Sequence, residues 1–310
     1  MAEIGIMVEG QEDMTWERFF RLAEAVEDLG FSHLFRSDHL TGIFGYPERA
    51  SLALWPSLTA LAMRTKRIRF GPMVCPVTFR HPVMVAKMAA SVDQLAGGRL
   101  DLGIGAGWND MEHAMFGIDY PRYGIRLEML DEMATVIKLL WSGEPVTFQG
   151  KYYQLKDAQN HPGPAQQTII MGGKGEKTLK IVAKHATEWN FSYGGVDGFK
   201  EKSRELDENC AAIGRDPAEI RRSLMAPFVI GTDAVAVQKR IDAQLHTFPH
   251  LPATLAEWNE AGFTGGTPDK VVAQLKAFEA AGIERFMLQH NDLEDIASLE
   301  LMAREVLPHF

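Results

Sequence analysis

The chain has 310 residues, 46% of them hydrophobic and 24% charged, a composition typical of a folded globular protein with a large core. Its 32 Lys and Arg against 41 Asp and Glu give a formal net charge of −9, and no basic run occurs. Charge therefore excludes a broad surface for nucleic acid or anionic membranes. The length fits either two domains or one large α/β barrel.

Two cysteines, Cys75 and Cys210, are too few for a disulfide framework and do not form a Cys-x-x-Cys spacing. This cysteine usage predicts a reducing, cytoplasmic setting. The first residues lack the basic and apolar segments of a signal peptide, and no apolar run approaches the roughly 20 residues that span a bilayer. We therefore expect a cytoplasmic protein that binds neither nucleic acid nor a membrane.

Short apolar runs alternate with helical patterns from one end of the chain to the other. In chain order, strands are expected at residues 4–8, 33–36, 68–75, 100–104, 169–171, 188–192, 224–230 and 285–289. Helices are expected at residues 15–29, 55–63, 83–95, 126–141, 176–185, 199–212, 268–281 and 292–306, and a small hairpin at 147–155.

Eight strands alternating with helices predict an α/β fold of the TIM (β/α)8 barrel type rather than an open sheet. Residues 233–262 fall outside the alternation and are interpreted as an insertion. Because long loops often carry function, a lid over the site is favoured over padding of the exterior. One domain over residues 1–310 is expected.

Three stretches that follow predicted strands carry residues suited to chemistry, since the reactive groups of such barrels collect at the C-terminal ends of the strands. The first is Ser37-Asp38-His39, where a neighbouring acid can tune an imidazole for proton transfer near neutral pH. Its alternative interpretation is an N-cap or turn.

The second stretch is the glycine run 103–107 with Trp108, followed by Glu112 and His113. Glycines let the backbone approach a flat ligand and Trp108 offers an aromatic wall, although a plain tight turn is the alternative. The spacing is not the Gly-x-Gly-x-x-Gly of a dinucleotide fold.

The third stretch, Gly172-Gly173-Lys174, opens a predicted helix. Free backbone N–H groups there and a nearby ammonium favour a phosphate site, with a glycine turn and a solvated lysine as the alternative. Nucleotide triphosphate hydrolysis is not indicated, because the P-loop spacing is absent. No metal-ligand spacing occurs, so no metal is predicted.

Taken together, residues 37–40, 65–118, 126–155, 172–190 and 266–289 closely resemble the bacterial-luciferase-like flavin and deazaflavin oxidoreductases. The resemblance implies a TIM barrel with its cofactor at the strand C-termini, in a homodimer. The occurrence of SDHL at residues 37–40 together with GIGAGW at residues 103–108 is most similar to the branch of the family that uses the deazaflavin coenzyme F420. In that branch a non-prolyl cis peptide forms a bulge after the third strand, here at Met73–Val74.

The resemblance also implies roles for individual residues. Asp38 matches a position that hydrogen-bonds the deazaflavin ring, and His39 the histidine beside the reacting carbon. The other positions implied to contact the cofactor are Met73, Val74, Cys75, Gly107, Trp108, Gly172, Gly173 and Lys174.

The chain also departs from parts of the family. Trp108 stands where members that oxidise sugar phosphates carry glutamate. Residues 40–46 (LTGIFGY) lack the tryptophan that follows the Asp-His pair in those members and in secondary-alcohol oxidisers. Both departures argue against those substrates. The proton donor is assigned to His39 first, with Glu112 or His113 in reserve.

The leading hypothesis is an F420-dependent oxidoreductase that moves a hydride between the deazaflavin C5 and a small organic substrate. The alternative is an FMN-dependent monooxygenase that uses oxygen and reduced flavin from a separate reductase. A third possibility is a non-catalytic flavin-binding or structural barrel, against which the Asp38-His39 pair argues.

Overall fold

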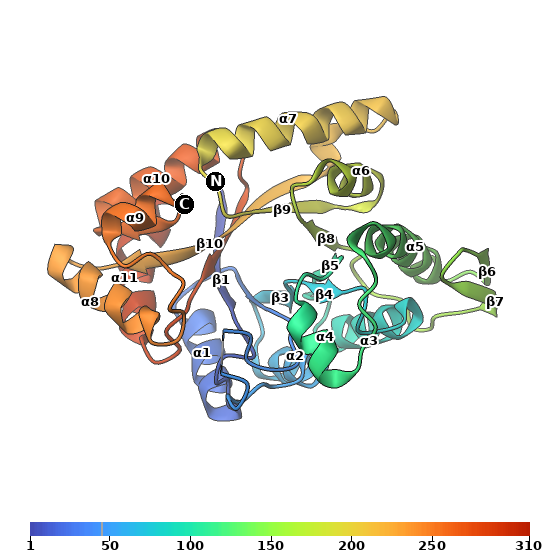
Figure 1. Ribbon diagram of the computed structural model, residues 1–310, viewed down its shortest axis with the longest axis horizontal. Coiled ribbons are helices and arrows are strands. Elements are labelled where there is room, and N and C mark those ends of the chain that lie inside the picture. Colours follow the sequence, from blue (N-terminus) through green and yellow to red (C-terminus); the bar gives the residue numbers. More distant parts are fainter. Residues whose placement is uncertain (45) are drawn as a thin grey trace.

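A ring of parallel strands surrounded by helices forms the centre of the molecule, which the computed structural model describes at residues 1–44 and 46–310 (Figure 1). The predicted TIM barrel is confirmed. Its strands are β1 Glu3–Val8, β2 His33–Arg36, β3 Arg69–Pro72, β4 Cys75–Pro76, β5 Leu102–Gly105, β8 Ile169–Gly172, β9 Glu188–Ser192, β10 Arg221–Ile230 and β12 Arg285–Gln289. They are ordered β3-β2-β1-β12-β10-β9-β8-β5-β4.

The strand predicted at 68–75 is divided into β3 and β4 by Met73 and Val74, whose peptide bond is cis as the resemblance implied. Both halves pair through their backbones with the segment that contains the next strand of the ring, β5. Phe70 forms a bridge with Leu100, and Cys75 pairs with Ile104 in β5. The barrel therefore closes, with a break in its wall where β3 ends.

The helices pack on the outside of the barrel through apolar faces. In α1, the buried residues Phe19, Leu22, Ala23 and Val26 recur at helical spacing, and Thr15 caps the N-terminus by accepting the Arg18 N–H. The full set is α1 Trp16–Asp28, α2 Leu54–Arg64, α3 Pro82–Leu95, α4 Asp110–Phe116, α5 Tyr123–Trp141, α6 Glu176–His185, α7 Val196–Ala212, α8 Ala234–Leu245, α9 Leu255–Glu260, α10 Pro268–Ala280 and α11 Ile296–Glu305, with short 3-10 turns at Pro217–Glu219 and Leu307–His309.

Four elements were not predicted as such. Helix α4 follows the glycine run, and the segment expected as an insertion folds into α8 and α9. The short strand β11 (Thr264–Gly266) then pairs with the end of β10. The predicted hairpin is present as β6 (Val146–Gln149) and β7 (Gln154–Ala158). In Figure 1 it projects beside α5, on the opposite side of the molecule from α8 and α9.

The barrel interior changes from ionic to apolar along its axis. Charged residues at the strand starts form an ionic floor, which consists of Glu3, Arg69, Asp101, Glu188, Arg221 and Arg285. Above it lies an apolar layer that consists of Met7, Phe35, Met73, Ile170 and Met287. The strand C-termini lie beyond this layer, and the candidate site is there.

Arg285 is the centre of the ionic floor and is only 3% exposed. Its guanidinium donates to Asp101 Oδ2 at 2.9 Å and to Glu3 Oε2 at 3.0 Å, and it lies 3.0 Å from Glu188 Oε2. Burial raises the pKa of the Glu188 carboxyl above its ordinary value, and the charge of Arg285 offsets this effect only in part. One arginine therefore compensates carboxylates from three other segments of the barrel.

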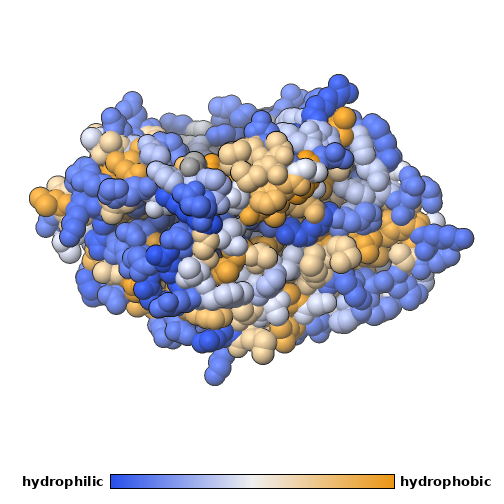
Figure 2. Space-filling model, turned by 60° about the horizontal axis from the view of Figure 1, so that its bottom comes forward, coloured by the Kyte–Doolittle hydropathy of each residue, from blue (hydrophilic) through white to orange (hydrophobic). Residues whose placement is uncertain are grey.

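The outer surface is mainly polar on the face seen in Figure 2, but apolar side chains gather near its middle. Among the exposed apolar residues are Met111, Met115 and Phe116 of α4. Across residues 1–44 and 46–310, no helix combines the length and apolarity that a membrane crossing requires.

Replacing Arg285 tests the ionic floor. Arg285→Ala leaves Glu188 buried without its ion-pair partner and leaves Asp101 with Arg69 alone, so the free energy of unfolding is expected to fall by about 3–5 kcal/mol in a urea titration. The control Arg304→Ala, whose side chain is exposed beside Glu305, is expected to change it by about 0.5 kcal/mol or less. Equal losses in the two variants would contradict the central role of Arg285.

Candidate active site

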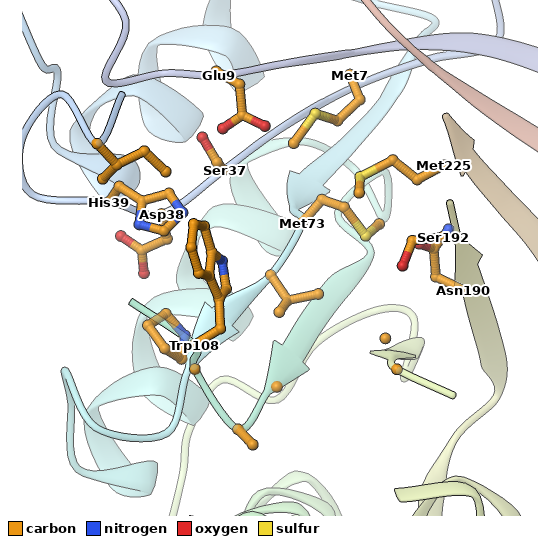
Figure 3. Close-up of a pocket in the computed structure, with 18 of the residues that line it drawn as sticks. Met7, Glu9, Ser37, Asp38, His39, Met73, Trp108, Asn190, Ser192 and Met225 are labelled. Carbon is orange, nitrogen blue, oxygen red and sulfur yellow. The ribbon is translucent and has the colours of Figure 1, made fainter. Parts of the chain in front are cut away.

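A cavity of about 400 Å³ opens at the C-terminal ends of the barrel strands (Figure 3). Ten of the twelve predicted site residues line it, namely Asp38, His39, Met73, Val74, Gly107, Trp108, Glu112, His113, Gly172 and Gly173. The other two, Cys75 and Lys174, are not among the lining residues. The three sequence stretches, far apart along the chain, are therefore brought to one cavity.

His39 and Glu112 form a buried pair at this cavity. The Nδ1–H of His39 donates to Glu112 Oε1 at 2.7 Å, and the Leu40 backbone N–H donates to Glu112 Oε2 at 3.0 Å. The Glu112 side chain is 2% exposed and that of His39 12%. Because Nδ1 is held by the carboxylate, Nε2 is left as the nitrogen available for proton transfer.

The pair also sets the proton affinity of His39. Burial lowers the pKa of the imidazole, but the hydrogen bond and charge of Glu112, with the charges of Glu9 and Asp38, outweigh burial and raise it above its ordinary value. The ring of Trp108 meets His39 edge to face, with 5.7 Å between the centroids. His39 is thus a histidine whose protonated form is stabilised next to an aromatic wall.

Asp38 is paired with a cation that the sequence did not single out. Arg80 Nη2 donates to Asp38 Oδ1 at 3.1 Å, and Arg80 Nη1 contacts both Asp38 Oδ2 and, at 3.5 Å, Cys75 Sγ. Burial raises the pKa of the Cys75 thiol well above its ordinary value, so the thiol stays protonated and is a wall group rather than a nucleophile.

His113 lines the cavity with both ring nitrogens already in use. Nδ1 lies 2.5 Å from the Asn109 carbonyl, and Nε2 lies 2.7 Å from the Thr78 hydroxyl. Its ring also packs against Phe79 and Tyr120. These contacts join α4 to the loop after β4, which makes His113 part of the support for Glu112.

The glycine run makes room for the break in the third strand. A Cβ on Gly105 would come within 2.6 Å of Val74 Cγ2, and Gly107 has a left-handed φ of +76°. Val74 therefore packs directly on the backbone of β5. The result is a wall of Met73, Val74 and bare backbone on one side of the cavity.

The Gly172-Gly173-Lys174 turn joins β8 to α6. A Cβ on Gly172 would meet no atom within 4 Å, so free space lies next to it, whereas Gly173 has a φ of +113° and a Cβ there would come within 2.9 Å of Thr178 Cγ2. The Lys174 ammonium donates to the Tyr193 carbonyl at 2.8 Å. The turn thus combines free space, the N-terminus of α6 and a cation.

Several further residues line the cavity; some lie within barrel strands and others directly follow a strand. Figure 3 shows two of them, Met7 of β1 and Met225 of β10, gathered with the predicted Met73 across the cavity from Trp108 and His39. Glu9 follows β1, and Ser192 and Tyr193 end or follow β9. Asn190 borders the cavity and donates to Ser223 Oγ at 2.9 Å, whereas its neighbour Trp189 packs against Phe199 in the outer core. Position after a strand was a signal that could have identified Glu9 and Tyr193, whereas the residues within strands carry no such signal.

A family model described as luciferase-like monooxygenase matches residues 1–280. An F420-dependent glucose-6-phosphate dehydrogenase from Amycolatopsis mediterranei is 34% identical over 313 residues, which cover 92% of each chain. A protein of the same name from Microbacterium testaceum is 36% identical over 194 residues. These span 61% of this chain and 57% of that protein, so this match covers less than two thirds of that relative's length.

The chain is also similar to an FMNH(2)-dependent dimethylsulfone monooxygenase from Pseudomonas fluorescens, at 23% identity over 316 residues, 93% of this chain and 85% of that protein. Among solved structures, an F420-dependent secondary alcohol dehydrogenase in complex with an F420-acetone adduct superposes with a TM-score of 0.86 at 20% identity. That match covers 99% of this chain and 98% of the other. At this identity the likeness concerns the fold.

Glu112→Gln tests the cause of the raised His39 pKa. The amide keeps the burial that disfavours the imidazolium but removes the carboxylate charge, so the pKa of His39 is expected to fall, as measured by NMR titration of the labelled ring. Because the wild-type pKa is raised on folding, the pair stabilises the fold fully below the unfolded-state pKa of about 6.5 and loses this effect as pH rises through the folded pKa.

The control for this titration is Glu128→Gln, which removes an exposed carboxylate of α5. It is expected to leave the pKa of His39 unchanged. A His39 pKa that is the same in Glu112→Gln and in the wild type would contradict the assigned cause.

Proposed function

The chain belongs to the luciferase-like monooxygenase family, and from that membership we propose that it is an F420-dependent oxidoreductase that transfers a hydride between the deazaflavin C5 and a small organic substrate. The observation that carries the proposal is the buried His39–Glu112 pair, which supplies an oriented acid–base group at the cavity. The relatives named for F420 are the more similar ones, at 34% and 36% identity.

The residues of the cavity fit such a cofactor. A flat ring needs a wall free of projecting side chains, and Val74 with the backbone of Gly105 and Gly107 provides one. The free space beside Gly172 and the N-terminus of α6 suit an anionic group. Met73, Val74, Gly107 and Trp108 would hold the ring, and the turn 172–174 its phosphate.

The chemistry is then divided between ligand and protein. When bound, the deazaflavin supplies the carbon that gives or accepts the hydride. His39 gives or takes the accompanying proton at Nε2, and Glu112 holds the ring through Nδ1. Met7 and Met225 line the side of the cavity away from His39, where their apolar side chains limit the access of water.

The second candidate is an FMN-dependent monooxygenase that receives reduced flavin from a separate reductase. It is favoured by the similarity to the dimethylsulfone monooxygenase, which extends over 93% of this chain. Binding of the two cofactors separates the candidates.

Fluorescence titration of the purified protein with F420 and with FMN tests the proposal. The deazaflavin is expected to bind about ten-fold or more tightly than FMN, a difference of about 1.4 kcal/mol. Gly172→Val, which projects into free space, is expected to weaken deazaflavin binding about ten-fold or more without lowering Tm. Gly163→Val, in a remote loop, is expected to change neither. FMN binding with no deazaflavin binding would overturn the proposal.

His39→Ala is expected to reduce the rate of hydride transfer about 10²–10⁴-fold, with deazaflavin affinity within about three-fold of the wild type. The assay follows deazaflavin absorbance with a substrate found by screening, and His309→Ala is the control because His309 is exposed at the C-terminus. Substrate reduction requires the imidazolium, so its rate falls as pH rises through the raised pKa of His39. Oxidation shows the opposite slope. Unchanged turnover in His39→Ala would contradict the assigned role.

A further inference from the structure

A second cavity of about 400 Å³ adjoins the first, and Phe44 and Tyr193 line both. Its other walls come from the segment around α8 and α9 and from the end of β12. The residues that define this cavity, called here the aromatic chamber, include Phe44, Tyr193, Phe248, Phe263, Gln289 and Asn291. A molecule bound at the first cavity can therefore extend into the chamber between Phe44 and Tyr193.

The chamber is built mainly from aromatic rings. Phe44 meets Phe248 edge to face, with 5.1 Å between the centroids, and stacks on His250 at 4.4 Å. Tyr193 meets Phe263 edge to face at 5.8 Å. Within the part of the chain that the structure describes, the chamber lining contains no Lys, Arg, Asp or Glu. Such a lining favours an uncharged, apolar molecule.

One residue of the chamber lining, Asn291, has a buried hydrogen-bond acceptor that lacks a donor among the described residues. Gln244 Nε2 donates to the Phe228 carbonyl at 3.5 Å, and Gln244 Oε1 accepts from Asn291 Nδ2 at 3.0 Å. These two hydrogen bonds fix the orientation of the Asn291 amide. Asn291 is 5% exposed, and its Oδ1 has no hydrogen-bond partner among residues 1–44 and 46–310. A buried acceptor in this state is stabilised by a ligand that donates to it.

We propose that the aromatic chamber binds the body of the substrate, a neutral and mostly apolar organic molecule with a hydroxyl or N–H group that donates to Asn291 Oδ1. The assignment of this molecule as substrate rests on the proposed function, whereas its binding does not. A substrate that places a phosphate in the chamber is disfavoured, because no Lys or Arg lines the chamber among the described residues.

The test uses calorimetric titration of the full chain with three bicyclic probes. These are 1-tetralol, which is neutral and donates a hydrogen bond, its methyl ether, which does not donate, and 1-naphthyl phosphate, which is anionic. The alcohol is expected to bind about ten-fold or more tightly than the ether and the phosphate. In Asn291→Leu the alcohol is expected to lose this advantage over the ether.

A second variant locates the binding without altering the buried core. Ala261 borders the chamber and is exposed, so Ala261→Phe narrows the chamber from its rim and is expected to weaken 1-tetralol binding about ten-fold or more. Val235→Phe, at an exposed position of α8 that does not line either cavity, is the control and is expected to change nothing.

Three results would overturn the proposal: tighter binding of the phosphate than of the alcohol, equal binding of alcohol and ether to the wild type, or an Ala261→Phe affinity equal to that of the wild type. Cofactor titration separates this failure from that of the proposed function. If the probes bind as expected and F420 does not bind, the chamber is supported as a binding site and the proposed function is rejected. If F420 binds and the alcohol does not, only the assignment of the chamber as a binding site is rejected.

Discussion

The ion pairs around Arg285 hold the strands of the barrel together at their N-terminal ends. Arg285 begins β12 and contacts acids from β1, β9 and the segment before β5, while Arg69 and Arg221 share two of these acids. Buried charges tolerate little displacement, because each loses its compensation when it moves. The ionic floor therefore sets the stagger of the strands, and with it the position of the residues at their opposite ends.

Most of the barrel could be predicted because several strands are apolar on both faces and so appear as continuous runs, such as residues 4–8 and 169–171. The ionic floor could not, since Asp101 and Glu188 have the charge of surface residues and become buried partners only when the ring closes. Helix α4 was missed because seven residues are too few for a periodic pattern.

The candidate site, like the barrel, could be predicted from the sequence only in part. His39, Glu112 and Gly172 lie in stretches that follow strands, so a topological rule was sufficient to bring them to one cavity. Arg80 and Tyr193 depend on loop conformation, which local sequence specifies weakly. The aromatic chamber needs side chains from residue 44, from the α8–α9 segment and from the end of β12, and no short stretch of sequence contains that combination.

Glu112 orients His39 from α4, which is too short to persist alone in water. The helix is maintained by the Asn109 cap, the left-handed Gly117 and the hydrogen bonds of His113. Local opening of α4 would separate Glu112 from both His39 and the Leu40 amide in a single event. The exchange of the Leu40 amide proton with deuterated solvent therefore reports how long the histidine keeps its orientation.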